Sequence, residues 1–183
     1  MTSNSIVSFL QQQLSGAHDF FEGVLADVTA EQAHWLPPGR ANPIGATYAH
    51  VLTSEDGIIN GTLKGGAPLF ATGWAGKAGL SQPPPGPNPD APGLPDWGPW
   101  AREVQVDLPA MRQYAQAVYA ATDAYLASLN DEDFSKTIDL TMLGLGQRSI
   151  SNILLGGVLS NVQWHTGEIA CLKGLQGSKG YPI

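Results

Sequence analysis

The sequence is poor in charged residues and in cysteine. Charged residues make up only 14% of its 183 positions, nine basic and sixteen acidic. The resulting net charge of −7 would repel the phosphate backbone of a nucleic acid and the surface of an anionic membrane, so we expect neither partner. The single cysteine, Cys171, excludes an internal disulfide bond and suits a reducing compartment.

Long apolar runs and a leader signal are also missing. The most apolar stretch, residues 150–164, is interrupted by five polar side chains, so it would not span a bilayer. Residues 1–14 carry no basic region ahead of an apolar core, which argues against a secretory signal. These absences together predict a soluble, cytoplasmic protein.

Strand patterns are absent as well, because no run of four to eight residues alternates β-branched and polar side chains. Helical periodicity, in contrast, covers four segments. They run from Ile6 to Val28, from about Ile44 to Leu63, from Val104 to Leu129 and from Ile150 to Leu175. Thr29 has capping-box spacing to Gln32, and Ser149 precedes the fourth segment as an N-cap. The pattern predicts an all-α four-helix bundle, with residues 1–183 in one domain.

Glycine and proline concentrate between the second and third helices. Residues 64–100 hold nine of the 14 prolines and eight of the 22 glycines, with no regular element expected among them. Loops this long in a compact domain are typical of lids or long crossovers, so we treat the loop as an insertion. Its tryptophans, Trp74, Trp97 and Trp100, predict that parts of it dock on the helices. A second loop, residues 139–147, includes a candidate extended piece at 140–142.

The fourth helix carries candidate metal ligands. Asn161 and His165 lie one turn apart, with Cβ atoms roughly 5–6 Å from each other, on the face that also holds Val158 and Ile169. Because a buried imidazole needs a partner for each ring nitrogen, His165 is either a ligand or a core histidine bonded to a neighbouring helix. His50, near the middle of the second helix, is the natural partner of His165. The apolar side chains between Ile44 and Ile59 form an arc along the second helix, and His50 lies on the flank of this arc. The small residues beside it form either a packing groove or the floor of a pocket.

Two carboxylates are candidates for acid–base chemistry. Glu55 falls inside the apolar arc of the second helix, where an unpaired carboxylate is costly. It would pair with His50, a metal or Arg148, unless that end of the helix is exposed. Glu168 lies one turn past His165 and is a ligand, a carboxylate behind a ligand, or a solvent-facing side chain.

Other titratable residues receive structural interpretations. His18 and Glu22 have the spacing of a surface ion pair on the first helix. Cys171 has few basic neighbours and fits an inert core thiol better than a nucleophile. Glu31 and His34 form one Glu-x-x-His pair, whereas a ferritin-like di-iron site needs two, so no di-iron centre is expected.

Two stretches of the sequence resemble the DinB-like (YfiT-like) superfamily. The run EQAHWLPPGRANPIGATYAHV, which contains His50, resembles the passage from the first to the second helix of that superfamily. The stretch SNVQWHTGEIACLKGLQG resembles its last helix, where a His-x-x-x-His pair leads into a short motif of the His-Arg-Gly-Gln type. Residues 165–168 occupy that motif, and the order of segments extends the resemblance over essentially the whole chain.

The resemblance implies a divalent metal, often nickel or zinc, held by three histidines between helices. Carried over, two ligand positions fall on His50 and His165, and the third falls on Asn161. An asparagine oxygen is a weaker partner than imidazole for these metals, so Asn161 weakens the expected site. Glu55 or Glu168 would then substitute, or the site is vestigial. The resemblance also implies a low-molecular-weight thiol as a cofactor, and a homodimer.

Two functions follow from these expectations. The first is a metal-dependent enzyme, a thiol-dependent transferase or isomerase or a related hydrolase, with Glu55 or Glu168 as base. The loop of residues 64–100 would then close a pocket for a small-molecule substrate. The second is a non-catalytic bundle with a degenerate metal site, which binds a small ligand or acts as a stress-associated homodimer. In that case His50, Asn161 and His165 would form a buried hydrogen-bond network.

Overall fold

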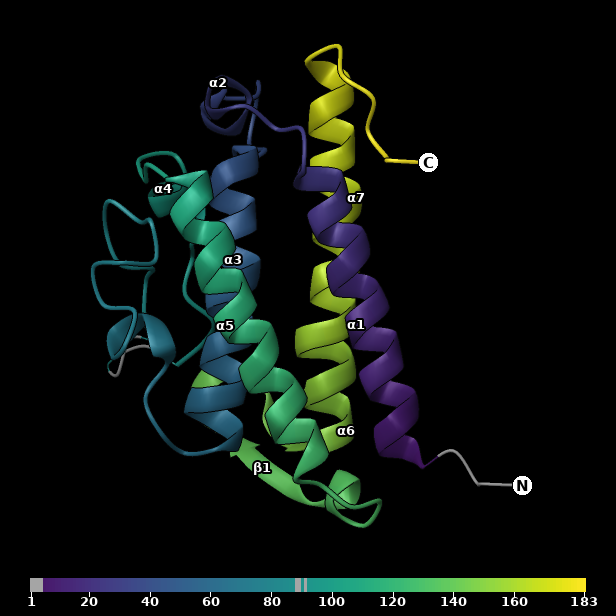
Figure 1. Ribbon diagram of the computed structural model, residues 1–183. Helices are drawn as coiled ribbons and strands as arrows, with labels where there is room; N and C mark the ends of the chain where they lie inside the picture. The colour runs from purple at the N-terminus through teal and green to yellow at the C-terminus, as the bar shows by residue number, and fades with distance from the viewer. Residues whose placement is uncertain (1–4, 88–89, 91) are drawn as a thin grey trace.

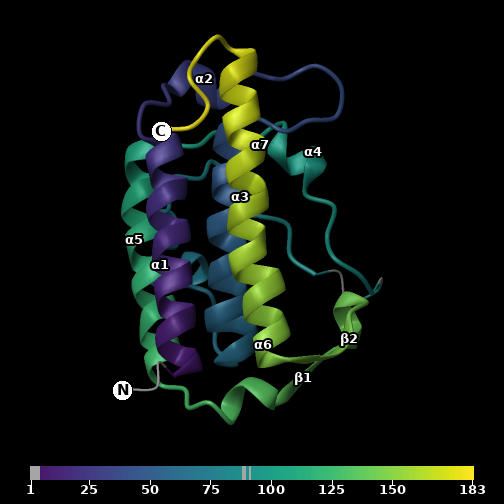
Figure 2. The ribbon, with the colours of Figure 1, turned by 90° about the vertical axis from the view of Figure 1, so that its right-hand side faces the viewer.

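The structure is a computed structural model that describes residues 5–87, 90 and 92–183. It is mostly helical, which confirms the predicted all-α class. Within the described residues, four long helical stretches lie side by side (Figures 1 and 2). They are α1 (Ile6–Leu25); α3 (Ile44–Asp56) with its continuation η1 (Gly57–Leu63); α5 (Leu108–Ala127); and α6 (Ile150–Asn152) with η5 (Ile153–Ser160) and α7 (Asn161–Leu175).

Side-chain oxygens cap the helices at two predicted positions. At the start of α2 (Ala30–His34), Thr29 Oγ1 accepts the backbone N–H of Gln32, whose Oε1 accepts the backbone N–H of Thr29. Ser149 Oγ accepts the backbone N–H of Asn152 at the start of α6. Each such cap stabilises its helix by about 1 kcal/mol, and each confirms a boundary predicted from the sequence.

Two of the long stretches contain π-helical turns, η1 after α3 and η5 before α7. A π-helix has more residues per turn than an α-helix, so steps of four residues stay on one face. The buried stripe consists of Leu154, Val158, Val162 and Thr166. The α-helical periodicity predicted Asn161 and His165 in this stripe. Both are instead half-buried on its flank, because the π-helical turns move the core face to Val162.

The stretch rich in glycine and proline is anchored on the helices. It contains two short helices that the sequence did not predict, η2 (Leu69–Ala71) and α4 (Gly98–Ala101). Trp100 is 9% exposed, and Trp74 and Trp97 are partly buried against the same core. The predicted docking of these three tryptophans is therefore confirmed.

A two-stranded antiparallel hairpin joins α5 to α6. Strand β1 (Thr137–Leu140) pairs with β2 (Gly146–Ser149). The predicted extended piece at 140–142 is correct only for Leu140, the last residue of β1, because residues 141–143 form a 3-10 turn between the strands. Strand β1 has only two β-branched residues, Thr137 and Ile138, and β2 reads Gly-Gln-Arg-Ser without an apolar side chain, which explains why the sequence did not reveal a pair of strands here.

The core consists of two adjoining apolar clusters along the helices. The larger one is built from α1, α3, α5 and α7 together with the docked tryptophans, and the smaller one lies towards η1, η5 and the hairpin. In the part of the chain that the structure describes, no helix combines the length and apolar character needed to cross a membrane.

Candidate functional site

His50 and His165 come together from α3 and α7. Their ring centroids lie 5.2 Å apart, and the ring planes are nearly perpendicular, at 83°. Both residues are half-buried. The structure therefore brings together the two histidines that the sequence singled out, although they are 115 positions apart (165 − 50).

Each imidazole uses its Nδ1 atom on its own helix. His165 Nδ1–H donates to Glu168 Oε2 at 2.6 Å, and His50 Nδ1 contacts Ser54 Oγ at 3.5 Å. Among the described residues, no hydrogen bond reaches Nε2 of either histidine. A carboxylate on one ring nitrogen with the other nitrogen free is typical of histidines that bind a metal. Glu168 is thus the hydrogen-bond partner of His165 on the same helix.

An indole ring covers one face of His50. Trp97, the residue immediately before α4, stacks on the imidazole with ring centroids 4.0 Å apart and planes within 5° of parallel. It also meets His165 edge to face, with centroids 5.9 Å apart. The sequence placed Trp97 in a docked loop without pairing it with His50.

The surroundings of His50 favour its neutral form. Burial, together with the neighbouring His165, lowers the pKa of His50 to about 4, and Glu168 acts in the opposite direction without offsetting them. At neutral pH the imidazole is therefore uncharged, which is the form that can bind a metal or accept a proton.

Asn161 is half-buried one helical turn before His165. Among the residues that the structure describes, no three His, Cys, Asp or Glu side chains converge as a metal-binding group. The described residues therefore offer His50 and His165 no third ligand of these four types. The side-chain oxygen of Asn161 remains the candidate at the third ligand position that the resemblance implies.

Glu55 does not join the two histidines. It is 1% exposed, and both of its oxygens are engaged in the core. Oε2 accepts from His18 Nε2–H at 3.0 Å, and Oε1 accepts from the Thr122 hydroxyl at 2.6 Å. The helix explains this placement, because five residues turn the chain by roughly 140°, so Glu55 and His50 leave α3 in different directions.

The predicted surface ion pair between His18 and Glu22 is wrong. His18 is 6% exposed and stacks on Tyr119, with centroids 3.9 Å apart, while its Nε2 binds Glu55. Glu22 instead accepts the hydroxyls of Tyr48 at 2.9 Å and Tyr119 at 2.7 Å. These bonds connect α1, α3 and α5 through polar groups that the helical spacing alone did not link.

Asp56 is a second buried carboxylate, which the sequence did not single out. It is fully buried and accepts four hydrogen bonds. Oδ2 accepts the Tyr114 hydroxyl at 2.7 Å and the Phe70 N–H at 3.0 Å, and Oδ1 accepts the Leu69 N–H at 2.9 Å and Asn60 Nδ2 at 2.8 Å. Asp56 thereby fastens the start of the Gly/Pro-rich stretch to α3 and α5.

The remaining candidates have structural surroundings. His34 Nδ1–H donates to the Ala30 carbonyl at 2.8 Å, and its Nε2 accepts the Val106 N–H at 2.9 Å, so both nitrogens are used within the fold. Cys171, predicted as a core thiol, is exposed on α7. The prediction of a core thiol is therefore wrong, because it rested on the lack of basic neighbours, which does not determine burial.

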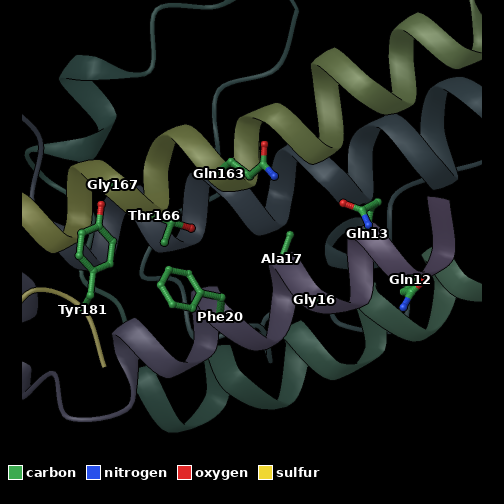
Figure 3. Close-up of a pocket in the computed structure, with 9 residues that line it drawn as sticks. All are labelled: Gln12, Gln13, Gly16, Ala17, Phe20, Gln163, Thr166, Gly167 and Tyr181. Atoms are coloured by element: carbon green, nitrogen blue, oxygen red, sulfur yellow. The ribbon is translucent and has the colours of Figure 1, made fainter. Parts of the chain in front are cut away.

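A separate groove lies between α1 and α7, on the face shown in Figure 3. Its volume is about 380 Å³, and its lining carries no charged side chain. The lining residues are Gln12, Gln13, Gly16, Ala17, Phe20, Gln163, Thr166, Gly167 and Tyr181. None of the histidines lines this groove, so it is distinct from the site formed by His50 and His165.

Comparison with known proteins supports the relationship suggested by the sequence. The crystal structure of a conserved protein from Enterococcus faecalis has a similar fold, with a TM-score of 0.77 and 21% sequence identity. The match covers 94% of this chain and 98% of that one. No curated protein matches the chain. The pattern of the DinB superfamily matches residues 13–167, and the chain therefore belongs to the DinB superfamily.

Proposed function

We propose that the protein is a metal-dependent enzyme in which His50 and His165 hold a divalent cation, nickel or zinc. The observation that carries the proposal is the meeting of two imidazoles from different helices, neither of which has a hydrogen bond to its Nε2 from the residues that the structure describes. Imidazole nitrogens suit late first-row metals, and Glu168 on His165 supplies the outer carboxylate that such ligands commonly have. The donors present thus fit such a cation.

Asn161 completes the proposed ligand set as a neutral oxygen donor. Losing an outer partner of a metal ligand typically costs 10–100-fold in affinity, and exchanging an imidazole for an amide should cost at least as much. We therefore expect weaker binding than three imidazoles would give. Three protein donors would also leave the cation a position for an exchangeable group.

The proposed reaction is the transfer or addition of a low-molecular-weight thiol to a small-molecule substrate. A bound cation would supply Lewis acidity, which lowers the pKa of a thiol that contacts it. Glu168 keeps His165 in the tautomer with hydrogen on Nδ1, and Trp97 excludes water from one face of His50. Glu55 has no part in this proposal, because both of its oxygens bind other core residues. The resemblance supports a homodimer as the working assembly.

A non-catalytic bundle with a degenerate metal site is the second candidate. The observation that favours it is the lack, among the described residues, of a third His, Cys, Asp or Glu beside the two histidines. Under this alternative the protein binds a small ligand or acts as a stress-associated homodimer.

Metal analysis distinguishes the two candidates. The untagged protein, purified without chelator, would be analysed for bound elements and then titrated with Ni²⁺ and Zn²⁺. The metal-dependent function predicts near-stoichiometric binding that His165→Ala abolishes and Asn161→His strengthens. Metal-free protein that ignores both ions in all three forms would contradict it and leave the non-catalytic candidate.

A further inference from the structure

Trp97 makes the closest aromatic contact at the proposed site. Its indole is parallel to the His50 imidazole within 5° at a centroid distance of 4.0 Å, and it meets His165 at 85°. We propose that Trp97 is a positioning residue, which fixes the ring plane in which His50 presents its free nitrogen to a ligand shared with His165. This inference rests on the proposed metal-dependent function and names a residue that serves it.

Apart from its aromatic neighbours, the described residues give the His50 ring one polar contact. Its contact with Ser54 Oγ is long, at 3.5 Å, and the rotation of an imidazole about its last side-chain bond is only weakly restricted by the bond itself. His165, in contrast, is held by a 2.6 Å hydrogen bond to Glu168. The two rings of the site are thus oriented by different means, one by a carboxylate and the other by an aromatic face.

The backbone of Trp97 is placed firmly enough to act on another ring. Its carbonyl accepts the Ala101 N–H at 2.9 Å, so it is part of the turn that starts α4. Ala101 and Trp100 are 1% and 9% exposed and belong to the core cluster. On the preceding side, Asp96 Oδ1 accepts the Gly98 N–H at 3.0 Å. A movement of Trp97 away from His50 would therefore disturb a packed turn.

Metal titration tests the positioning role. Isothermal titration with Ni²⁺ would compare the wild type with Trp97→Ala, Trp97→Phe and Trp164→Ala. Because an aromatic pair contributes modestly, we expect Trp97→Ala to weaken binding by about 2- to 10-fold, and Trp97→Phe to restore most of the loss. Trp164 is the matched control, since it precedes His165 directly but is 70% exposed. An affinity of Trp97→Ala within twofold of the Trp164→Ala value would overturn the proposal.

A second measurement separates this inference from the metal-dependent function itself. Imidazole proton signals of His50 in the metal-free protein report the indole above the ring through its ring current. In Trp97→Ala we expect these signals to move downfield and broaden, whereas Trp97→Phe should keep narrow lines, and thermal melts would check that all variants are folded. If the wild type binds neither Ni²⁺ nor Zn²⁺, the proposed function fails, and the positioning role is decided by these signals alone. Unchanged His50 signals in Trp97→Ala would then overturn it.

Discussion

Replacing Asp56 by asparagine should destabilise the protein more than its conservative shape suggests. In the wild type, each carboxylate oxygen accepts two hydrogen bonds in a fully buried position. An asparagine can offer one accepting oxygen, so two bonds are lost and its NH₂ group faces two donors. Bonds to a charged group contribute about 1.5–3 kcal/mol each, so the loss of two bonds would cost about 3–6 kcal/mol if nothing compensated for it. Rotation of the Tyr114 hydroxyl relieves part of this, and we expect about 2–4 kcal/mol.

The expected loss can be measured globally and locally. For a chain of this size, 2–4 kcal/mol corresponds to a fall in Tm of roughly 4–16 °C. Asp131→Asn is the matched control, because Asp131 is exposed. With the new NH₂ group on the side of the Tyr114 hydroxyl, hydrogen exchange should accelerate most at the amide of Phe70, which loses its acceptor, while the amide of Leu69 keeps the asparagine oxygen. A Tm within 1 °C of the control, with the amide of Phe70 still protected, would refute the assignment of Asp56 as the anchor of the Gly/Pro-rich stretch.

Three further predictions concern the protonation of His50, the buried hydrogen bonds of Glu55 and the backbone at Gly79. The pKa of His50 is about 4 in the folded protein and near 6.5 in the unfolded chain. The contribution of neutral His50 to the free energy of unfolding should therefore be fully present above pH 6.5, and about 3 kcal/mol of it should be lost as the pH falls towards 4. Urea unfolding across this range should show that His50→Gln lacks this component, and an identical pH profile would contradict the shift. Glu55→Ala should cost about 2–6 kcal/mol, because it leaves the buried His18 Nε2–H and the Thr122 hydroxyl without their acceptor, while Ni²⁺ affinity stays unchanged. A parallel loss of affinity would place Glu55 in the site after all. Gly79 has a φ of +79°, and an added Cβ would lie 2.6 Å from a backbone oxygen, so Gly79→Ala should cost about 2 kcal/mol or more in thermal melts. Gly73→Ala is the control, because a Cβ added at Gly73 has no atom within 4 Å. Equal melting temperatures of the two variants would contradict the expected strain at Gly79.

The helices could be predicted because their cores follow local rules. Residues 108–127 show an uninterrupted apolar stripe, and α5 forms there. Thr29 and Ser149 each cap a backbone N–H only three positions further along the chain, so the spacing of residues was enough to predict both caps. The π-helical turns, in contrast, depend on a change in hydrogen-bond register that no composition marks. They displaced Asn161 and His165 from the stripe predicted for them.

The candidate site was predictable only in its two histidines. His50 and His165 stood out because an imidazole on or beside an apolar face needs an explanation, and the family resemblance pointed to the same positions. The partners of Glu55 and the stacking of Trp97 on His50 depend on how far each helix and the long loop are rotated against one another. Such contacts between distant segments have no signature in a single sequence.

The π-helical turns also bear on how the length of this chain can change. A π-helical turn holds one residue more than the α-helical turn that could replace it. A deletion within residues 153–160 can therefore be absorbed by converting η5 to α-helix, while α7 keeps its orientation towards α3. The same holds for residues 57–63 after α3. We expect single-residue gaps between relatives to gather in these two segments, where a change of length leaves His50 and His165 facing each other.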